Sequence, residues 1–221
     1  STRMVALDSK DVLEPGDDAP DFELKGTDGE HYSLDDFADH EALLLVFTCN
    51  HCPYAKAKFA EMNRLAAEYD DVAVVGINPN DETEYPDDDF ETMVERVEDG
   101  TIRWDAYLRD ESQETAAAYG AQCTPDPFLF ENGDDAGTFE LVYHGRLDDG
   151  LNPDDEVTER EIPRIVEILA RPRNLVRGAV EAAPRVFVPV DLVRAAVVCL
   201  VLREGHDGVE VAVPVNVSRR N

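Results

Sequence analysis

The chain has 221 residues, 43% of them hydrophobic, and its 49 acidic against 20 basic residues give a formal net charge of −29. This excess argues against nucleic-acid binding, because phosphates would be repelled. The longest apolar run, residues 195–202, is far shorter than the roughly 20 residues of a spanning helix, so no membrane association is expected. The first ten residues lack a signal-peptide pattern, and we predict a cytoplasmic protein.

The acidic residues are spread along the chain from Asp8 to Glu161 and beyond, and lysine is nearly absent. An acidic tail is therefore excluded. We interpret the charge as an adaptation of the whole surface to high salt, that is, a halophilic protein. An acidic docking surface is the alternative.

Turn signals and hydrophobic periodicity predict a regular series of elements before residue 170. Residues 42–47 are a continuous apolar run, typical of a central strand buried on both faces. The other predicted elements are a hairpin over residues 22–24 and 31–33, a short helix over 34–37, helices over 55–66, 90–97, 112–119 and 162–169, strands over 72–77 and 104–108, and an antiparallel pair over 128–130 and 139–143.

This alternation of strands and helices, followed by a hairpin and a helix, predicts an α/β fold with three layers. The composition changes after Ala170, because residues 171–221 contain eight arginines but five acidic residues and are rich in valine. We therefore divide the chain into a domain over 1–170 and a C-terminal extension over 171–221. The extension is predicted to form a β-hairpin appendage, whose strand edges offer a route to a homo-oligomer.

Cys49 and Cys52 follow the predicted central strand directly and precede a predicted helix. The start of a helix favours an anion, so a thiolate at Cys49 is expected to be stabilised and its pKa lowered. Cys52 is close enough to attack a mixed disulfide on Cys49, and the neighbouring His51 would make the disulfide more oxidising. The pair is therefore interpreted as a redox-active disulfide.

Two other interpretations of the pair remain open. A structural zinc site needs four ligands, and the sequence offers only a makeshift set of Cys49, His51, Cys52 and the distant His144. A purely structural disulfide is the other alternative. Neither metal nor cofactor is expected.

Three segments together resemble the thioredoxin superfamily, in its redoxin or AhpC/TSA (peroxiredoxin-like) branch. APDFELKGTDGEHYSLDDF resembles the N-terminal hairpin of redoxins, and LLLVFTCNHCPYAKA resembles the active-site strand, C-x-x-C pair and helix. YGAQCTPDPFLFENGDDAGTFELVYHGRLDD resembles the segment that precedes and forms the last hairpin. The resemblance covers roughly residues 17–170 and implies a thioredoxin-like α/β/α sandwich.

The resemblance also implies a cis peptide bond at Thr124-Pro125 that faces the cysteines and shapes the substrate groove. Two features depart from the relatives. Typical thioredoxins have Trp where Thr48 stands, and neither cysteine matches the P-x-x-x-T-x-x-C pattern of peroxiredoxins. Arg109 and Arg146 are only loose candidates for the peroxiredoxin arginine. Cys123 is a candidate third redox residue beside the proline, and Cys199 is expected to be a packed core thiol.

We therefore predict a thiol–disulfide oxidoreductase in which Cys49 attacks, Cys52 resolves and His51, Thr124 and Pro125 complete the catalytic site. The expected partners are thiol or disulfide substrates and an upstream reductant. A peroxiredoxin-like antioxidant that reduces hydroperoxides is the first alternative. A non-enzymatic metal-binding protein on the same fold is the second.

Overall fold

The computed structural model describes residues 12–133, 137–150 and 152–169. Its elements are β1 (Leu24–Gly26), β2 (His31–Tyr32), the short 3-10 helix η1 (Leu34–Phe37), β3 (Ala42–Phe47), α1 (Pro53–Glu68), β4 (Val72–Asn78), the 3-10 helix η2 (Pro86–Asp88), α2 (Phe90–Glu98), β5 (Ala106–Arg109), α3 (Glu114–Tyr119), β6 (Asp126–Asn132), β7 (Phe139–His144) and α4 (Glu161–Leu169). Every element predicted before residue 170 is present, with shifts of a few residues at its ends.

One mixed sheet of seven strands, in the order β2-β1-β5-β4-β3-β6-β7, organises the described chain. The three strands β3, β4 and β5 are mutually parallel, which is the expected consequence of the helical crossovers between them. The remaining neighbouring strands pair antiparallel. The predicted N-terminal hairpin therefore joins this sheet as an edge, through the pairing of β1 with β5.

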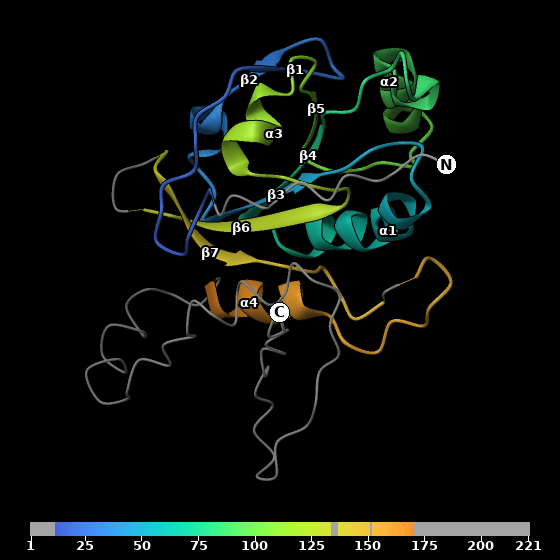
Figure 1. The fold of residues 1–221 in the computed structure, drawn as a ribbon. Coiled ribbons are helices and arrows are strands. Elements are labelled where there is room, and N and C mark those ends of the chain that lie inside the picture. Colours follow the sequence, from blue (N-terminus) through green and yellow to red (C-terminus); the bar gives the residue numbers. More distant parts are fainter. Residues whose placement is uncertain (1–11, 134–136, 151, 170–221) are drawn as a thin grey trace, which may run out of the picture.

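The central strand β3 is fully buried along its whole length, as the apolar run predicted. Because side chains alternate between the two faces of a strand, its residues divide between two apolar layers. Leu43, Leu45 and Phe47 pack with side chains of α3 and η1, whereas Leu44 and Val46 pack with side chains of α1 and α4. Figure 1 shows α3 on one side of the sheet and α1 with α4 on the other. The predicted α/β/α sandwich is confirmed.

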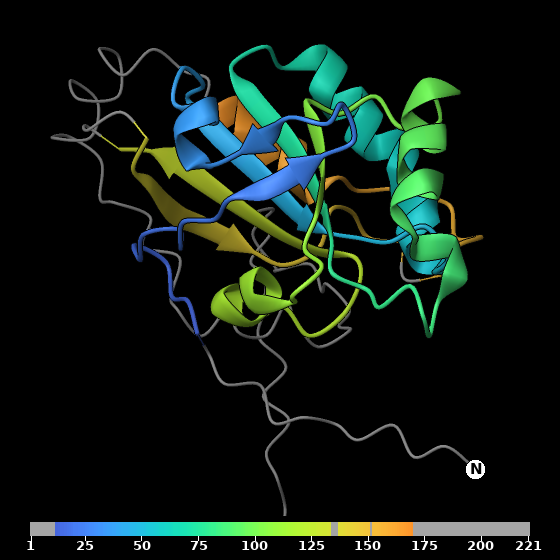
Figure 2. The ribbon, with the colours of Figure 1, turned by 90° about the horizontal axis from the view of Figure 1, so that it is seen from above.

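Helix α2 packs beside the N-terminal half of α1, where Met93 joins Ala55, Phe59 and Cys49 in a third apolar cluster. Seen from above in Figure 2, α1 and α2 lie together at one end of the sheet. The C-terminal ends of β3, β4 and β5 meet at this end, because the three strands run parallel. The sheet therefore brings the segment that follows β3 together with the segment between β4 and α2.

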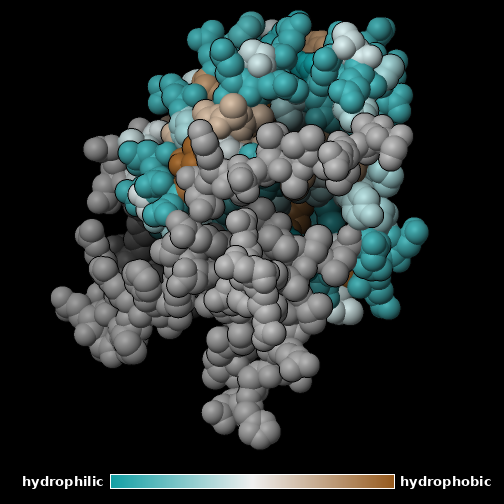
Figure 3. Space-filling model, in the orientation of Figure 1, coloured by the Kyte–Doolittle hydropathy of each residue, from teal (hydrophilic) through white to brown (hydrophobic). Residues whose placement is uncertain are grey.

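The described surface on the face in Figure 3 is mostly hydrophilic, with small hydrophobic patches. Within the described part of the chain, no helix is both long and apolar enough to cross a bilayer. The predicted C-terminal hairpin, the Cys199 prediction and the whole of the 171–221 extension lie outside the described residues.

Candidate active site

Cys49 and Cys52 lie in the short connection between the buried strand β3 and helix α1, and both are free thiols. Cys49 is completely buried, whereas Cys52 is partly exposed. Cys52 is the N-cap residue of α1, because the helix begins at Pro53. Proline is favoured at this first helical position, since its ring fixes a helical φ and its missing N–H has no partner to lose there. The partly exposed thiol is thus the one at the start of the helix.

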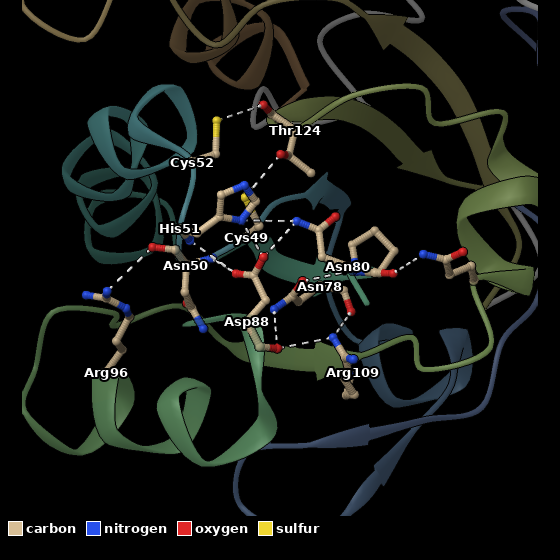
Figure 4. A network of polar contacts seen from close by, with 12 residues as sticks. Cys49, Asn50, His51, Cys52, Asn78, Asn80, Asp88, Arg96, Arg109 and Thr124 are labelled. Atoms are coloured by element: carbon tan, nitrogen blue, oxygen red, sulfur yellow. Dashed lines mark hydrogen bonds and ion pairs between the residues drawn. The ribbon is translucent and has the colours of Figure 1, made fainter. Parts of the chain in front are cut away.

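The loop before β6 faces both cysteines. The peptide bond Thr124-Pro125 is cis, as predicted. The Sγ atom of Cys49 lies 3.1 Å from the hydroxyl oxygen of Thr124, and the thiol of Cys52 points to the backbone carbonyl of Thr124 at 3.7 Å. In Figure 4, dashed lines join Thr124 to both cysteines. The predicted site residues Cys49, Cys52, Thr124 and Pro125 are therefore brought together.

The prediction of a lowered pKa at Cys49 is wrong. Burial raises the pKa of the Cys49 thiol to about 11, and the negative charges of Asp88 and of a Cys52 thiolate add to this effect. The Thr124 hydroxyl and a backbone N–H of Cys52 act in the opposite direction but do not overcome burial. The sequence argument failed because the helix begins four residues after Cys49, which leaves this thiol inside the protein instead of at the helix terminus.

His51 is held by Asp88, a residue that sequence reasoning missed. The Nδ1 atom of His51 lies 2.5 Å from the Asp88 carboxylate, which is fully buried, whereas the His51 side chain is 30% exposed. The same carboxylate accepts hydrogen bonds from the backbone N–H groups of Asn50 and His51, at 2.5 and 3.1 Å, and from the Asn80 amide, at 2.8 Å. The ring of Tyr85 stacks on His51, with 4.2 Å between the ring centroids.

Asp88 lies at the end of η2, and its own backbone is fixed from two strands. Its carbonyl oxygen accepts hydrogen bonds from the side chains of Asn78, at the end of β4, and Arg109, at the end of β5. Figure 4 shows Asn78 and Arg109 to the right of Asp88, with His51 and Cys49 above it. The connection between β4 and α2 is thereby tied to the cysteine segment.

Asn50 is buried between the two cysteines and is also held. Its side-chain oxygen accepts a hydrogen bond from the Tyr107 hydroxyl at 3.0 Å, and its carbonyl accepts one from Arg96 at 3.5 Å. The nitrogen of its side-chain amide has no hydrogen-bond partner among the described residues. Burial raises the pKa of Tyr107 well above its usual value, so this hydroxyl remains a donor.

Cys49, His51 and Asp88 each offer a potential metal-ligand atom, and these three atoms lie within 4.8 Å of one another. Both oxygens of Asp88 already accept hydrogen bonds from N–H donors, and the Nδ1 atom of His51 contacts the same carboxylate. Structural zinc sites use four ligands. His144, the fourth member of the makeshift set, contacts Asp126 through Nε2 at 2.7 Å instead. The arrangement therefore fits a hydrogen-bond network better than a metal centre.

The remaining candidates lie around or away from the thiols. Cys123 is exposed and directly precedes Thr124. Arg109 is engaged by the backbone oxygens of Asn78 and Asp88, and Arg146 pairs with Glu161 at 3.2 Å. The two arginines that the sequence offered for a peroxidase are thus engaged elsewhere.

The chemistry open to this site is thiol chemistry. A partly exposed thiol at a helix N-terminus is suited to attack a substrate from solvent, because thiolates gain from the free N–H groups there. A buried thiol three residues earlier is suited to attack only its neighbour. The side-chain hydroxyl of Thr124 lies beside the Cys49 sulfur and its backbone carbonyl beside the Cys52 sulfur. The backbone at Thr124 is placed to orient an extended substrate segment.

The chain is similar to a known protein family and to solved structures. Residues 15–147 match the AhpC/TSA family. An uncharacterised conserved protein from Geobacillus kaustophilus is 36% identical, with a TM-score of 0.64 over 71% of this chain and 82% of its own. A hypothetical protein from Sinorhizobium meliloti 1021 is also 36% identical, with a TM-score of 0.60 over 66% and 78%. A search of curated proteins finds no match. Since the family match covers more than half of its residues, the chain belongs to the AhpC/TSA family.

Proposed function

We propose that the protein is a thiol–disulfide oxidoreductase that exchanges electrons with protein or small-molecule disulfides through Cys49 and Cys52. The observation that carries this proposal is the pairing of two free thiols of opposite exposure beside one loop, with contacts from both to Thr124. Family membership supports thiol-dependent chemistry in general.

The exposures support a division of roles opposite to the one expected from the sequence. Cys52 attacks the substrate disulfide R–S–S–R′, forms a Cys52–S–S–R bond and releases R′S⁻, which is protonated. Cys49 then attacks Cys52, forms the Cys49–Cys52 disulfide and releases R–S⁻. The two electrons gained by the substrate come from the two thiols. A dithiol reductant must restore them, and a reducing compartment such as the cytoplasm, predicted from the sequence, would supply one.

Trapping of the mixed disulfide tests both the activity and the roles. The reduced protein is expected to reduce insulin disulfides rapidly. A Cys49→Ser variant should accumulate a stable mixed disulfide on Cys52, because the resolving thiol is missing, whereas a Cys52→Ser variant should accumulate none. Mass spectrometry of the peptides identifies the linked residue. Absence of insulin reduction would refute the activity, and a mixed disulfide on Cys49 would refute the roles.

A thiol peroxidase is the second candidate, favoured by the family match and by the partial exposure of Cys52. In that case peroxide oxidises Cys52 to a sulfenic acid, and Cys49 condenses with it and releases water. A sulfenic-acid reagent applied to the Cys49→Ser variant after peroxide would then label Cys52, and peroxide consumption would far exceed that of free cysteine. We expect peroxide to react at about the rate of free cysteine instead.

A further inference from the structure

The buried carboxylate of Asp88 lies beside the thiol that must act second. The Cys49 sulfur, a nitrogen of the His51 ring and an oxygen of Asp88 all lie within 4.8 Å of one another. Asp88 is completely buried, and its hydrogen bond with His51 joins it to a side chain that reaches solvent. A buried carboxylate is costly unless it is well partnered, and here hydrogen bonds from three residues hold it in place.

The buried thiol needs a proton acceptor. With a pKa of about 11, Cys49 is a thiolate in only about one molecule in ten thousand at pH 7. The thiolate is the form that attacks a disulfide. The Asp88 charge is one reason for the raised pKa, since two anions side by side repel. Because these groups lie so close together, the Cys49 thiol can donate a proton and the His51 ring, held by Asp88, can accept it.

We propose that His51, held by Asp88, takes the proton of Cys49 as Cys49 attacks the mixed disulfide on Cys52. This inference rests on the function proposed above. The Cys49 S–H bond breaks, a Cys49–Cys52 bond forms, and the Cys52–S–R bond breaks with its electron pair on R–S⁻. The proton moves to the His51 ring, which the Asp88 carboxylate holds through Nδ1. It then passes to R–S⁻ or to solvent at the exposed side of the ring.

The surroundings hold this pair in one geometry. The ring of His51 is confined between Asp88 and the stacked Tyr85. Asp88 is fixed through its backbone by Asn78 and Arg109. A ring nitrogen of His51 lies within 4.8 Å of the Cys49 sulfur. Proton transfer requires this contact to tighten to hydrogen-bond distance, as catalytic hydrogen bonds often do only in the reacting complex.

Other charged or titratable groups also face this pair, and they bear on any pH profile. In the described chain they are Cys52 on the same loop, Tyr85 beside η2, Arg96 on α2, and Tyr107 and Arg109 on β5. Arg96 contacts the backbone oxygen of Asn50, and Arg109 contacts that of Asp88. The phenols of Tyr85 and Tyr107 have raised pKa values and stay protonated near neutrality.

The test separates attack from resolution in one reaction. The full chain, with Cys123 and Cys199 replaced by Ser, is mixed in a stopped-flow instrument with one equivalent of Ellman's reagent. The attack by Cys52 releases a first coloured thiolate, and the attack by Cys49 releases a second. The coloured thiolate needs no proton to leave, so the second phase reports on removal of the proton from Cys49. Both phases are followed between about pH 5 and pH 8, the range in which histidine side chains in general change their charge.

Asp88→Asn is the principal variant, because its remaining amide oxygen can still accept the two backbone N–H bonds. We expect its second phase to be slowed roughly tenfold or more at pH 7, as is typical when a general base is lost. The rate should then rise about tenfold per pH unit, following the thiolate fraction. The unsubstituted pair should instead level off with pH. His51→Gln should slow the second phase in the same way. Asp87→Asn, an exposed neighbour with the same loss of charge, is the matched control.

Several outcomes would overturn the inference. A second phase in Asp88→Asn and His51→Gln within about twofold of Asp87→Asn, with the same pH profile, would show that neither residue takes the proton. An unchanged first phase and unchanged circular dichroism show that a variant is folded, and if Asp88→Asn fails this check, His51→Gln decides alone. Failure of the proposed function looks different: the unsubstituted pair would then release only one coloured thiolate.

Discussion

The sulfur of Cys49 and the hydroxyl oxygen of Thr124 lie 3.1 Å apart, although 75 positions separate these residues in the chain. The register of the sheet brings them together. Phe47, at the end of β3, pairs with Asp126, at the start of the antiparallel strand β6. Cys49 lies two residues after Phe47, and Thr124 lies two residues before Asp126. The sheet thus aligns the thiol with the loop that carries the cis proline.

This contact predicts the effect of Thr124→Val. The Thr124 hydroxyl lowers the pKa of Cys49, so its removal raises that pKa further. We expect the second phase of the reaction with Ellman's reagent to slow by roughly threefold to tenfold, since each pKa unit corresponds to a tenfold change in thiolate. Thr124→Ser keeps the hydroxyl and is the control, which should react at close to the original rate. Equal rates in the two variants would show that the hydroxyl does not act on Cys49.

The buried position of Cys49 predicts its titration. The thiolate absorbance of a Cys52→Ser variant is measured against pH, and that of the Cys49→Ser/Cys52→Ser protein is subtracted from it. The difference reports on Cys49 and should have its midpoint near pH 11. The folded pKa is raised above the unfolded value, so stability is unaffected below about pH 9 and falls as the pH rises through about 11. Replacement of Cys49 by Ser should reduce this alkaline loss. A midpoint near neutrality would restore the original expectation of a stabilised thiolate.

The same charges bear on the reduction potential. The sequence, through His51 alone, predicted a reduction potential above that of thioredoxin. The structure places the Asp88 carboxylate against His51, and burial of Cys49 outweighs the contacts that stabilise its thiolate. Since only a stabilised thiolate favours the reduced form, we now expect a potential near the thioredoxin end, about −270 mV. Equilibration with glutathione buffers and mass spectrometry of the alkylated thiols measures it. A value near −180 mV, as in protein disulfide isomerase, would support tuning by His51.

Much of the fold could be predicted because its signals are local. The apolar run 42–47 became the buried strand β3, and Gly100 and Gly120, which follow predicted helices, adopt the positive φ that ends them. The cis proline followed from resemblance rather than from any local signal. Pro53 also indicates where α1 begins, because proline favours the first helical position. This places Cys52 at the N-cap.

Asp88 could not have been found in this way. It lies in the acidic run Asp87-Asp88-Asp89, in which no residue differs in type from its neighbours. Only the tertiary structure distinguishes them, because it buries Asp88 against His51, leaves Asp87 exposed and uses Asp89 as the N-cap of α2. Sequence patterns report the periodicity of an element, whereas this site depends on where the β4–α2 connection folds back.

The acidic surface predicts a dependence of stability on salt. Repulsion among exposed carboxylates destabilises the compact state, and salt screens it. If the charge is an adaptation to high salt, the thermal midpoint should rise steadily between about 0.1 M and molar KCl, where the screening length falls from about 10 to 3 Å. Sodium perchlorate at matched ionic strength is the control for general screening. A midpoint that is independent of KCl would favour an acidic docking surface instead.

Gly76 in β4 connects the core to the site through close packing. A Cβ atom at this position would lie 2.3 Å from an indole carbon of Trp104 and 3.1 Å from the ring of Tyr107. Trp104 packs edge-on against Tyr107, with their ring centroids 5.0 Å apart, and the Tyr107 hydroxyl holds Asn50 beside Cys49. A methyl group at Gly76 would therefore displace the rings that support the cysteine segment.

We expect Gly76→Ala to lower the free energy of unfolding by about 1–3 kcal/mol, the usual cost of overpacking, and to slow the attack of Cys49 on Cys52. Urea unfolding and the second phase of the Ellman's reaction measure the two effects. Trp104→Leu is the matched background, because the smaller side chain removes the clash. If overpacking is the cause, Gly76→Ala should lower the free energy of unfolding much less in the Trp104→Leu protein than in the original one. The effects of the two substitutions should then be strongly coupled. Additive effects would show that Gly76 acts through its backbone conformation rather than through Trp104.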